Sequence, residues 1–212
     1  MLYQEQIQAN KERFISLVKT AGELNEKKKE GLERLLQWLE TTDFYTSPAS
    51  TVYHQNYDGG LCEHVLSVYD HLEKLVKDYG YEDKISGYSR IITALFHDFC
   101  KIGRYEKTYK TVPRKDEKGV EIKDANGKLI WEKQEVISYK QDPGVILGHS
   151  AKSVYLIQFF ISLTREEAEA IYSHMGPFDL SEYFTRKDLS AIYSRNKLAY
   201  LLHISDMNDL YL

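Results

Sequence analysis

Apolar residues recur at intervals of three and four along most of this 212-residue chain. Such spacing places them on one face of an α-helix. It predicts helices at residues 14–21, 32–39, 61–78, 91–96, 149–160, 165–174 and 198–211. Thr164 followed by Glu167 adds a capping box at the start of the sixth of these helices. Since each helix carries an apolar stripe to bury, we expect a mostly α fold, a helical bundle.

One stretch between the predicted helices departs from this pattern. Residues 104–142 contain short runs of β-branched and aromatic residues at 120–122 and 129–131, and Asn126-Gly127 lies between the runs. An Asn-Gly pair suits the two-residue type I′ turn of a hairpin. We therefore expect a small inserted β-hairpin. Residues 101–140 carry eleven Lys or Arg against seven Asp or Glu, so this insertion is also a candidate surface for an anionic substrate or a partner.

Length and composition indicate one soluble, folded domain. A chain of this size can form a single core, on which the helices of residues 1–44 would pack. Residues 1–10 are polar, and the longest apolar run, at 154–163, is about half as long as a membrane span. Cys62 and Cys100 are too few for a disulfide framework. We expect a cytoplasmic protein without a membrane partner, and the oligomeric state is left open.

The adjacent pair His97-Asp98 is the main candidate for chemistry. Other imidazole and carboxylate groups, at separations that no local structure requires, complete a possible ligand set: His64, His149, His174 and Asp206. Imidazole and carboxylate together suit Mn, Fe, Co, Ni or Zn better than Ca or Mg. The sequence therefore predicts one or two divalent transition metal ions.

A bridging Asp98 would divide these ligands between two ions. One ion would take His64, His97, Asp98 and Asp206, and the other would take Asp98, His149 and His174. The second ion would be more open to substrate because it has fewer protein ligands. Water bound to such an ion has a pKa near about 7 and supplies hydroxide at neutral pH, so no side-chain nucleophile is needed. A centre with one metal ion is the simpler alternative.

The same residues resemble those of a known family. His64, His97-Asp98 and Asp206 look like the ligands of the HD superfamily of metal-dependent phosphohydrolases, and residues 97–101 are similar to its HDxxK form. The added His149 and His174 resemble the binuclear branch, which includes cyclic-dinucleotide phosphodiesterases and 3′-to-5′ exoribonucleases. The stretch from Pro48 to His64 also looks like the approach to the first ligand in HD proteins. The resemblance covers residues 45–210 apart from the hairpin.

The resemblance implies a phosphohydrolase that cleaves a phosphate ester of a nucleotide or short oligonucleotide with a metal-bridged hydroxide. Asp98 and Lys101 would be catalytic, and Lys101 would face the substrate phosphate, since it lies about one helical turn beyond Asp98. We expect His54, in the loop before the first ligand, and Arg104 also to contact substrate. The partners would be a small phosphorylated molecule, such as a nucleotide, or short single-stranded nucleic acid.

Two other classes of function share this ligand set. A di-iron oxygenase of HD type uses the same kinds of ligand, and oxygen uptake would distinguish it. A metal-binding or ligand-binding module without turnover is the other alternative, with the hairpin as its partner surface. Among the remaining histidines, His203 precedes Asp206 by three residues and is a candidate to orient that ligand.

Overall fold

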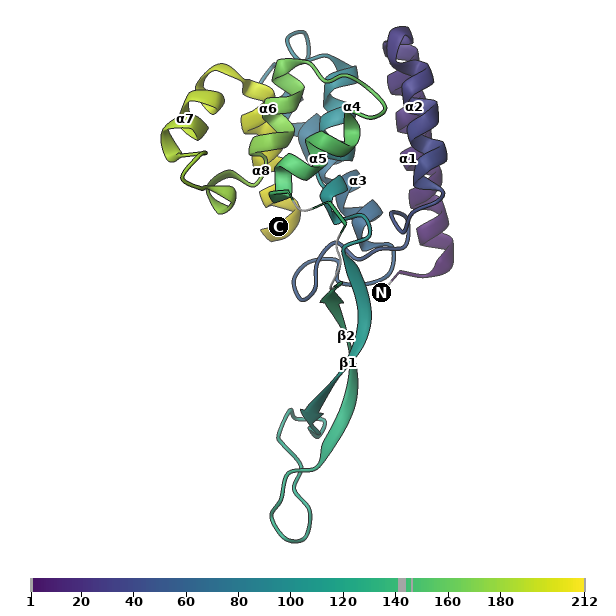
Figure 1. The fold of residues 1–212 in the computed structure, drawn as a ribbon, viewed down its shortest axis with the longest axis vertical. Coiled ribbons are helices and arrows are strands. Elements are labelled where there is room, and N and C mark those ends of the chain that lie inside the picture. Colours follow the sequence, from purple (N-terminus) through teal and green to yellow (C-terminus); the bar gives the residue numbers. More distant parts are fainter. Residues whose placement is uncertain (1, 141–143, 146, 212) are drawn as a thin grey trace.

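The computed structural model describes residues 2–140, 144–145 and 147–211. As predicted, the chain is mostly helical, with one small two-stranded sheet (Figure 1). The eight helices of the described residues are α1 (Gln4–Leu24), α2 (Glu26–Leu39), α3 (Gly60–Asp78), α4 (Gly87–Phe96), α5 (His149–Ile157), α6 (Arg165–Ser173), α7 (Arg186–Arg195) and α8 (Lys197–Tyr211). None of the helices in this described part is long and apolar enough to cross a membrane.

Helix α3 lies at the centre of the bundle and contributes to two apolar clusters. One face packs with α1 and α4, and α2 packs on α1; Phe14, Leu35 and Phe96 are fully buried in this cluster. The other face packs against α8, and Leu72 and Leu202 belong to a cluster that also includes apolar residues of α6 and α7. Burial on both sides fixes the position and rotation of α3, because any shift would open cavities in both clusters.

Two details of the helices differ from the sequence pattern. The Lys27 to Lys29 run belongs to α2, and only Asn25 separates α1 from α2. Helix α7 was not predicted, although Thr185 and Asp188 form a capping box at its start. Its apolar residues are few, so periodicity alone gives a weak signal there.

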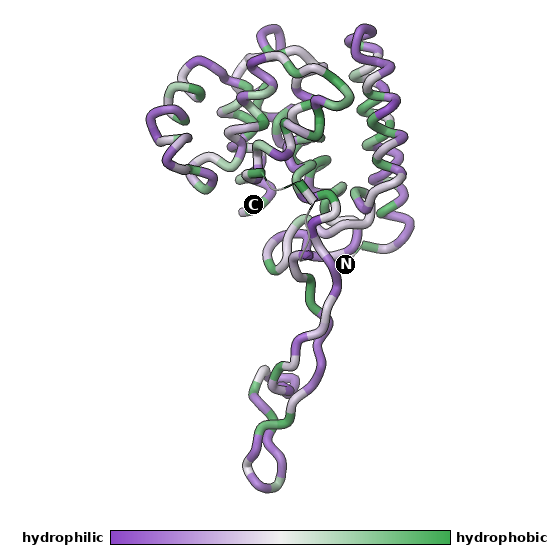
Figure 2. The backbone as a smooth tube through the Cα atoms, viewed as in Figure 1, coloured by the Kyte–Doolittle hydropathy of each residue, from purple (hydrophilic) through white to green (hydrophobic). Residues whose placement is uncertain are grey.

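The inserted hairpin is confirmed, but its strands differ from those predicted. β1 (Tyr105–Pro113) pairs antiparallel with β2 (Trp131–Tyr139), and the ribbon extends away from the helices (Figures 1 and 2). The runs at 120–122 and 129–131 were expected to be the strands. Instead they contribute only the bridges Lys115↔Glu121 and Lys123↔Leu129 and the first residue of β2. Residues 141 and 142 of the expected insertion lie outside the described part.

The Asn126-Gly127 turn is not of type I′. Gly127 has a φ of +80°, but Asn126 does not have the positive φ that this type requires at both central residues. The Asp124 carboxylate instead accepts hydrogen bonds from the backbone N–H groups of Asn126 and Lys128. This local acceptor stabilises a turn with only one left-handed residue.

Candidate metal centre

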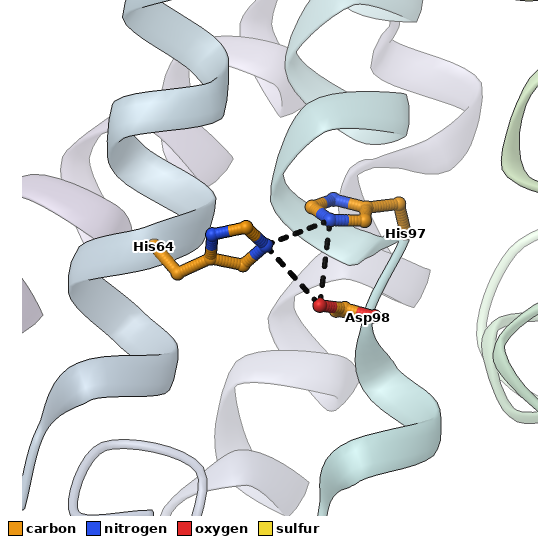
Figure 3. A group of neighbouring side chains, drawn as sticks. All are labelled: His64, His97 and Asp98. Atoms are coloured by element: carbon orange, nitrogen blue, oxygen red, sulfur yellow. Dashed lines mark hydrogen bonds and ion pairs between the residues drawn. The ribbon is translucent and has the colours of Figure 1, made fainter. Parts of the chain in front are cut away.

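The first group of predicted ligands lies where α3, α4 and α8 meet. The Nε2 atom of His64 is 3.2 Å from Nε2 of His97, 3.2 Å from Oδ2 of Asp98 and 3.3 Å from Oδ1 of Asp206. Figure 3 shows three of these four side chains directed toward one another. His64 and His97 are fully buried, and Asp98 and Asp206 nearly so. Four buried donors from three distant parts of the sequence therefore lie close together.

Asp98 also contacts a second group of donors. Its Oδ2 atom faces His64 and His97, whereas its Oδ1 atom lies 2.9 Å from Nε2 of His149 and 3.6 Å from Nε2 of His174. Three sets of three donor atoms are close enough to hold a metal ion: His64, His97 and Asp98; His97, His174 and Asp206; Asp98, His149 and His174. Because its two oxygens face different imidazoles, Asp98 has the geometry of a bridging ligand.

Helix ends orient two of the histidines in the same way. His97 is the C-cap residue of α4, and His174 is the C-cap residue of α6. Nδ1 of His97 donates to the carbonyl of Ala94, and Nδ1 of His174 donates to the carbonyl of Ile171, at 2.8 and 2.7 Å. The last carbonyls of a helix have no intrahelical partner, so they fix the tautomer of these rings. Each Nε2 atom is left as a lone-pair donor that points into the cluster.

The electrostatics of the cluster favour a bound cation. Burial lowers the pKa of His97 to about 3, so its imidazole is neutral. Burial also opposes charge on His64, but hydrogen bonds to Asp206, Asp209 and Asp98 outweigh it and raise the pKa of His64 well above its ordinary value. Burial disfavours the charged form of Asp98, yet Lys101 and the imidazoles hold its pKa well below the usual range. The carboxylates of Asp98, Asp206 and Asp209 therefore remain charged, and they outnumber the two cationic groups among them, Lys101 and protonated His64.

The residues present fit a transition metal. The set combines imidazoles with ionised carboxylates, which suits ions of borderline softness, and a bound metal ion would displace the proton that the raised pKa of His64 favours in its absence. In addition, Nε2 of His174 is buried and has no hydrogen-bond partner among the described residues. An unpartnered buried nitrogen is costly unless something binds it. A metal ion beside Asp98 would satisfy it.

Lys101 lies beside the carboxylate of Asp98, and its contact with a substrate phosphate stays a prediction. Its Nζ atom is 2.6 Å from Oδ2 of Asp98, and the side chain is 11% exposed. Burial opposes the charge of Lys101, but Asp98 more than compensates and raises its pKa. The 3-10 turn Phe99–Lys101 that follows α4 carries the lysine back toward Asp98. The cluster thus includes the positive charge of Lys101 directly beside Asp98.

His54 covers the first group from the loop before α3. Its ring centroid lies 5.0 Å from that of His64, and both of its ring nitrogens are buried without a hydrogen-bond partner in the described structure. Gly60 lets this loop approach α3, because a Cβ atom there would lie 2.1 Å from the carbonyl oxygen of Gln55. The loop therefore places an unpartnered imidazole against a ligand.

Arg104 is directed toward the hairpin. Its guanidinium lies over the ring of Tyr139, 5.0 Å from the centroid, at the base of β2. Its backbone N–H donates to the carbonyl of Lys101. The contacts of Arg104 thus connect the 3-10 turn that holds Lys101 to the hairpin. A contact between Arg104 and substrate stays a prediction.

Sequence reasoning missed Asp209 as part of the centre. Its Oδ2 atom is 2.6 Å from Nδ1 of His64, and it accepts a further hydrogen bond from Nε2 of Gln55 at 3.1 Å. This contact holds the His64 ring so that Nε2 faces the other donors. Asp209 follows Asp206 by three residues on α8, and that helical spacing was the available signal.

His203 contacts a different ligand from the one expected. Its Nδ1 atom donates to the backbone carbonyl of His174 at 2.7 Å, and its ring stacks on Tyr193. Tyr193 in turn donates its hydroxyl hydrogen to the carbonyl of Ser173. These contacts anchor the end of α6, so they position His174.

The second group of donors is the more open one. The side chain of His149 is 19% exposed, whereas His64, His97 and His174 are fully enclosed. His149 starts α5, which packs against the 3-10 turn after Asp98. His149 is therefore the donor with the most contact with solvent.

Comparison of the chain with protein-family models, with curated proteins and with solved structures finds no match.

Proposed function

We propose that this protein is a metal-dependent phosphohydrolase that cleaves a phosphate ester of a nucleotide or short oligonucleotide. The observation that supports this most is the carboxylate of Asp98, which faces imidazoles on both sides and has Lys101 beside it. A carboxylate between two sets of nitrogen donors suits a pair of metal ions. A lysine at the same carboxylate suits a substrate that is an anion.

We assign the donors to two ions that share Asp98. One ion would be held by His64, His97, Asp98 and Asp206, and the other by Asp98, His149 and His174. Transition ions held there would supply Lewis-acid activation of water and of the phosphoryl group. This would explain why a nucleophilic side chain is not required.

The protein's own groups would bind and orient the phosphate. With metal ions compensating Asp98, the ammonium of Lys101 is available to a phosphate oxygen at the open edge of the centre. His54 has two buried nitrogens without partners, so it would donate a hydrogen bond to the substrate on the side of His64. His97 and His174 are held rigidly by the helix ends and would keep the donor geometry during turnover.

We also propose that the protein acts in a reducing compartment such as the cytoplasm. Both cysteines are free and buried, and one of them lies within the metal centre. Oxidation of that thiol would introduce charge or bulk beside Asp98.

The test combines metal analysis with turnover. Protein purified without chelators is assayed for metal ions per chain, and for hydrolysis of bis(4-nitrophenyl) phosphate and 4-nitrophenyl phosphate. Asp98→Ala should lose both the metal ions and the activity, since it removes the shared ligand. His71→Ala is the matched control: His71 lies on α3 with His64 but outside the donor groups. It should keep both properties.

Two results would overturn the proposal. Full hydrolysis by Asp98→Ala without bound metal would show that the centre is not the site of reaction. Oxygen consumption by iron-loaded wild type, with both esters left intact, would assign the centre to the oxygenase class instead.

A further inference from the structure

The exposed aromatic side chains of the hairpin strands lie on one face of the ribbon. Successive residues of a strand alternate between the two faces, and residues directly opposite each other across an antiparallel pair share a face. Tyr109, Trp131 and Tyr139 are 65%, 56% and 57% exposed. The register of β1 and β2 places all three on the face formed by the odd-numbered residues of both strands. We call this the aromatic face.

The two faces of the ribbon also differ in charge. The aromatic face carries two lysines and one glutamate, whereas the opposite face carries one lysine and two glutamates: Lys107, Lys133 and Glu135 on the first, and Lys110, Glu106 and Glu132 on the second. The guanidinium of Arg104 lies over the ring of Tyr139 and adds a cation at the base of the aromatic face. The aromatic face is therefore cationic in a chain whose net charge is −4.

The acidic groups near this face leave its cations accessible. Glu135 accepts a hydrogen bond from the hydroxyl of Tyr109 at 3.4 Å, and its other oxygen is 4.0 Å from Nζ of Lys107. Lys107 also pairs with Asp58 at 2.8 Å, but both side chains are about half exposed. Exposed ion pairs of this kind contribute little, so a phosphate competes with them readily.

Exposed aromatic rings interleaved with lysines match the chemistry of single-stranded nucleic acid. Every base has a π-face that stacks on an aromatic ring, and lysines attract the backbone phosphates. In a duplex the base faces are already stacked on one another, so they are closed to side chains on a protein surface. The rings of Tyr109, Trp131 and Tyr139 therefore favour a single strand over a duplex.

The aromatic face begins beside the metal centre. Tyr105 at its inner end is buried, and its hydroxyl donates to the carbonyl of Ala49 at 3.4 Å. The backbone N–H of Arg104 donates to the carbonyl of Lys101, whose Nζ atom is 2.6 Å from Asp98. From this point the ribbon extends away from the helices (Figure 1). A strand bound along the face would therefore have one end at the turn that holds Lys101.

We propose that the aromatic face of the hairpin binds single-stranded nucleic acid and holds it for the metal centre. This inference rests on the proposed function and narrows the substrate to a single-stranded oligonucleotide rather than a mononucleotide. Stacking on Tyr109, Trp131 and Tyr139 and phosphate contacts with Lys107 and Lys133 supply the affinity.

Tryptophan fluorescence tests the contact directly. The chain has two tryptophans, Trp38 and Trp131, so Trp38→Phe leaves Trp131 as the reporter on the aromatic face. The probe is an oligothymidylate of about 12 nucleotides, within the range that single-strand binding proteins cover. It is added to metal-free protein so that it is not cleaved. The single strand should quench Trp131 in a saturable manner, and a duplex of the same length should quench it much less.

Variants on the two faces of the ribbon provide matched controls. Trp131→Ala and Tyr109→Ala should each weaken binding of the labelled oligothymidylate by about fivefold or more, measured by fluorescence anisotropy. Lys133→Ala should reduce the slope of log affinity against log salt by about 0.7, the value for one phosphate contact on a single strand. Lys110→Ala and Val112→Ala lie on the opposite face and should keep both the affinity and the slope. Thermal unfolding verifies that every variant is folded.

Three results would overturn the inference: no quenching of Trp131 by the single strand, equal losses from variants on both faces, or a duplex that binds as tightly as the single strand. A change in Trp131 emission that depends only on protein concentration would assign the aromatic face to a second copy of the chain instead, and would overturn it too.

Hydrolysis of bis(4-nitrophenyl) phosphate separates this inference from the proposed function. Trp131→Ala and Lys133→Ala should keep the wild-type rate with this small ester, because neither residue belongs to the donor groups. Hydrolysis of the ester by a wild type that binds no oligothymidylate would overturn the inference and leave the proposed function standing. Binding along the aromatic face by a metal-loaded protein that hydrolyses neither ester nor oligonucleotide would support the surface and overturn the proposed function.

Discussion

Replacement of Gly176 by alanine should disturb the second group of donors from a distance. Gly176 follows the ligand His174 by two residues and has a φ of +56°. A Cβ atom there would lie 2.5 Å from Cε1 and 2.9 Å from Nδ1 of His203. The His203 ring cannot move away freely, because Nδ1 donates to the carbonyl of His174 and the ring stacks on Tyr193. The clash with His203 should therefore displace the backbone of His174, a predicted ligand.

The magnitude follows from two separable costs. A left-handed backbone costs an alanine about 1–2 kcal/mol, and an overpacked methyl group adds about 1–3 kcal/mol. Gly80→Ala isolates the first cost, since Gly80 has a φ of +67° and nothing within 4 Å of its added Cβ. For a domain of this size, 1 kcal/mol corresponds to about 2–4 °C in Tm. Gly176→Ala should therefore melt about 2–12 °C below Gly80→Ala.

Calorimetry of the metal-free variants measures this difference, and elemental analysis after loading measures its effect on the centre. Gly176→Ala should lose one of two metal ions, while Gly80→Ala should keep both. Equal Tm values for the two variants would refute the steric argument. A normal metal content in a strongly destabilised Gly176→Ala would refute the link from His203 to His174.

Three further predictions concern the surroundings of the centre. Asp209→Asn should weaken zinc binding by about 10–100-fold, because it weakens the hydrogen bond that orients the His64 ring. Competition with a chelating dye measures the zinc affinity, and an unchanged affinity would exclude the orienting role of Asp209. Burial, with neighbouring His64 and Lys101, lowers the pKa of His54 from 6.5 to about 4, so the unfolded chain binds more protons in this range. The stability that neutral His54 contributes is complete above pH 6.5 and is lost as the pH falls to about 4. Between these pH values the free energy of unfolding of metal-free wild type should therefore fall more steeply than that of His54→Gln. Replacing residues 114–130, none of which is buried, by Asn-Gly should change the Tm by less than about 2 °C; a large loss would show that the hairpin tip stabilises the fold.

The sequence by itself determined most helices and the nature of the donor set. Helical spacing located α3, α5, α6 and α8, because each must bury one apolar face and therefore repeats its apolar residues at a fixed period. The residue types of His64 and the His97-Asp98 pair, with their resemblance to a metal-binding motif, were enough to predict a group of residues that could hold a metal ion. The inserted hairpin was also readable from composition, although the runs taken as its strands lie near its tip.

Only the tertiary structure decided how these groups face one another. The two oxygens of Asp98 meet different imidazoles because α3 and α5 approach the end of α4 from different sides, and no local pattern encodes that approach. Asp209 became recognisable for the same reason: its partner, His64, is 145 residues away in sequence. Periodicity records which face of a helix is buried, whereas contacts between distant polar atoms depend on how whole helices pack.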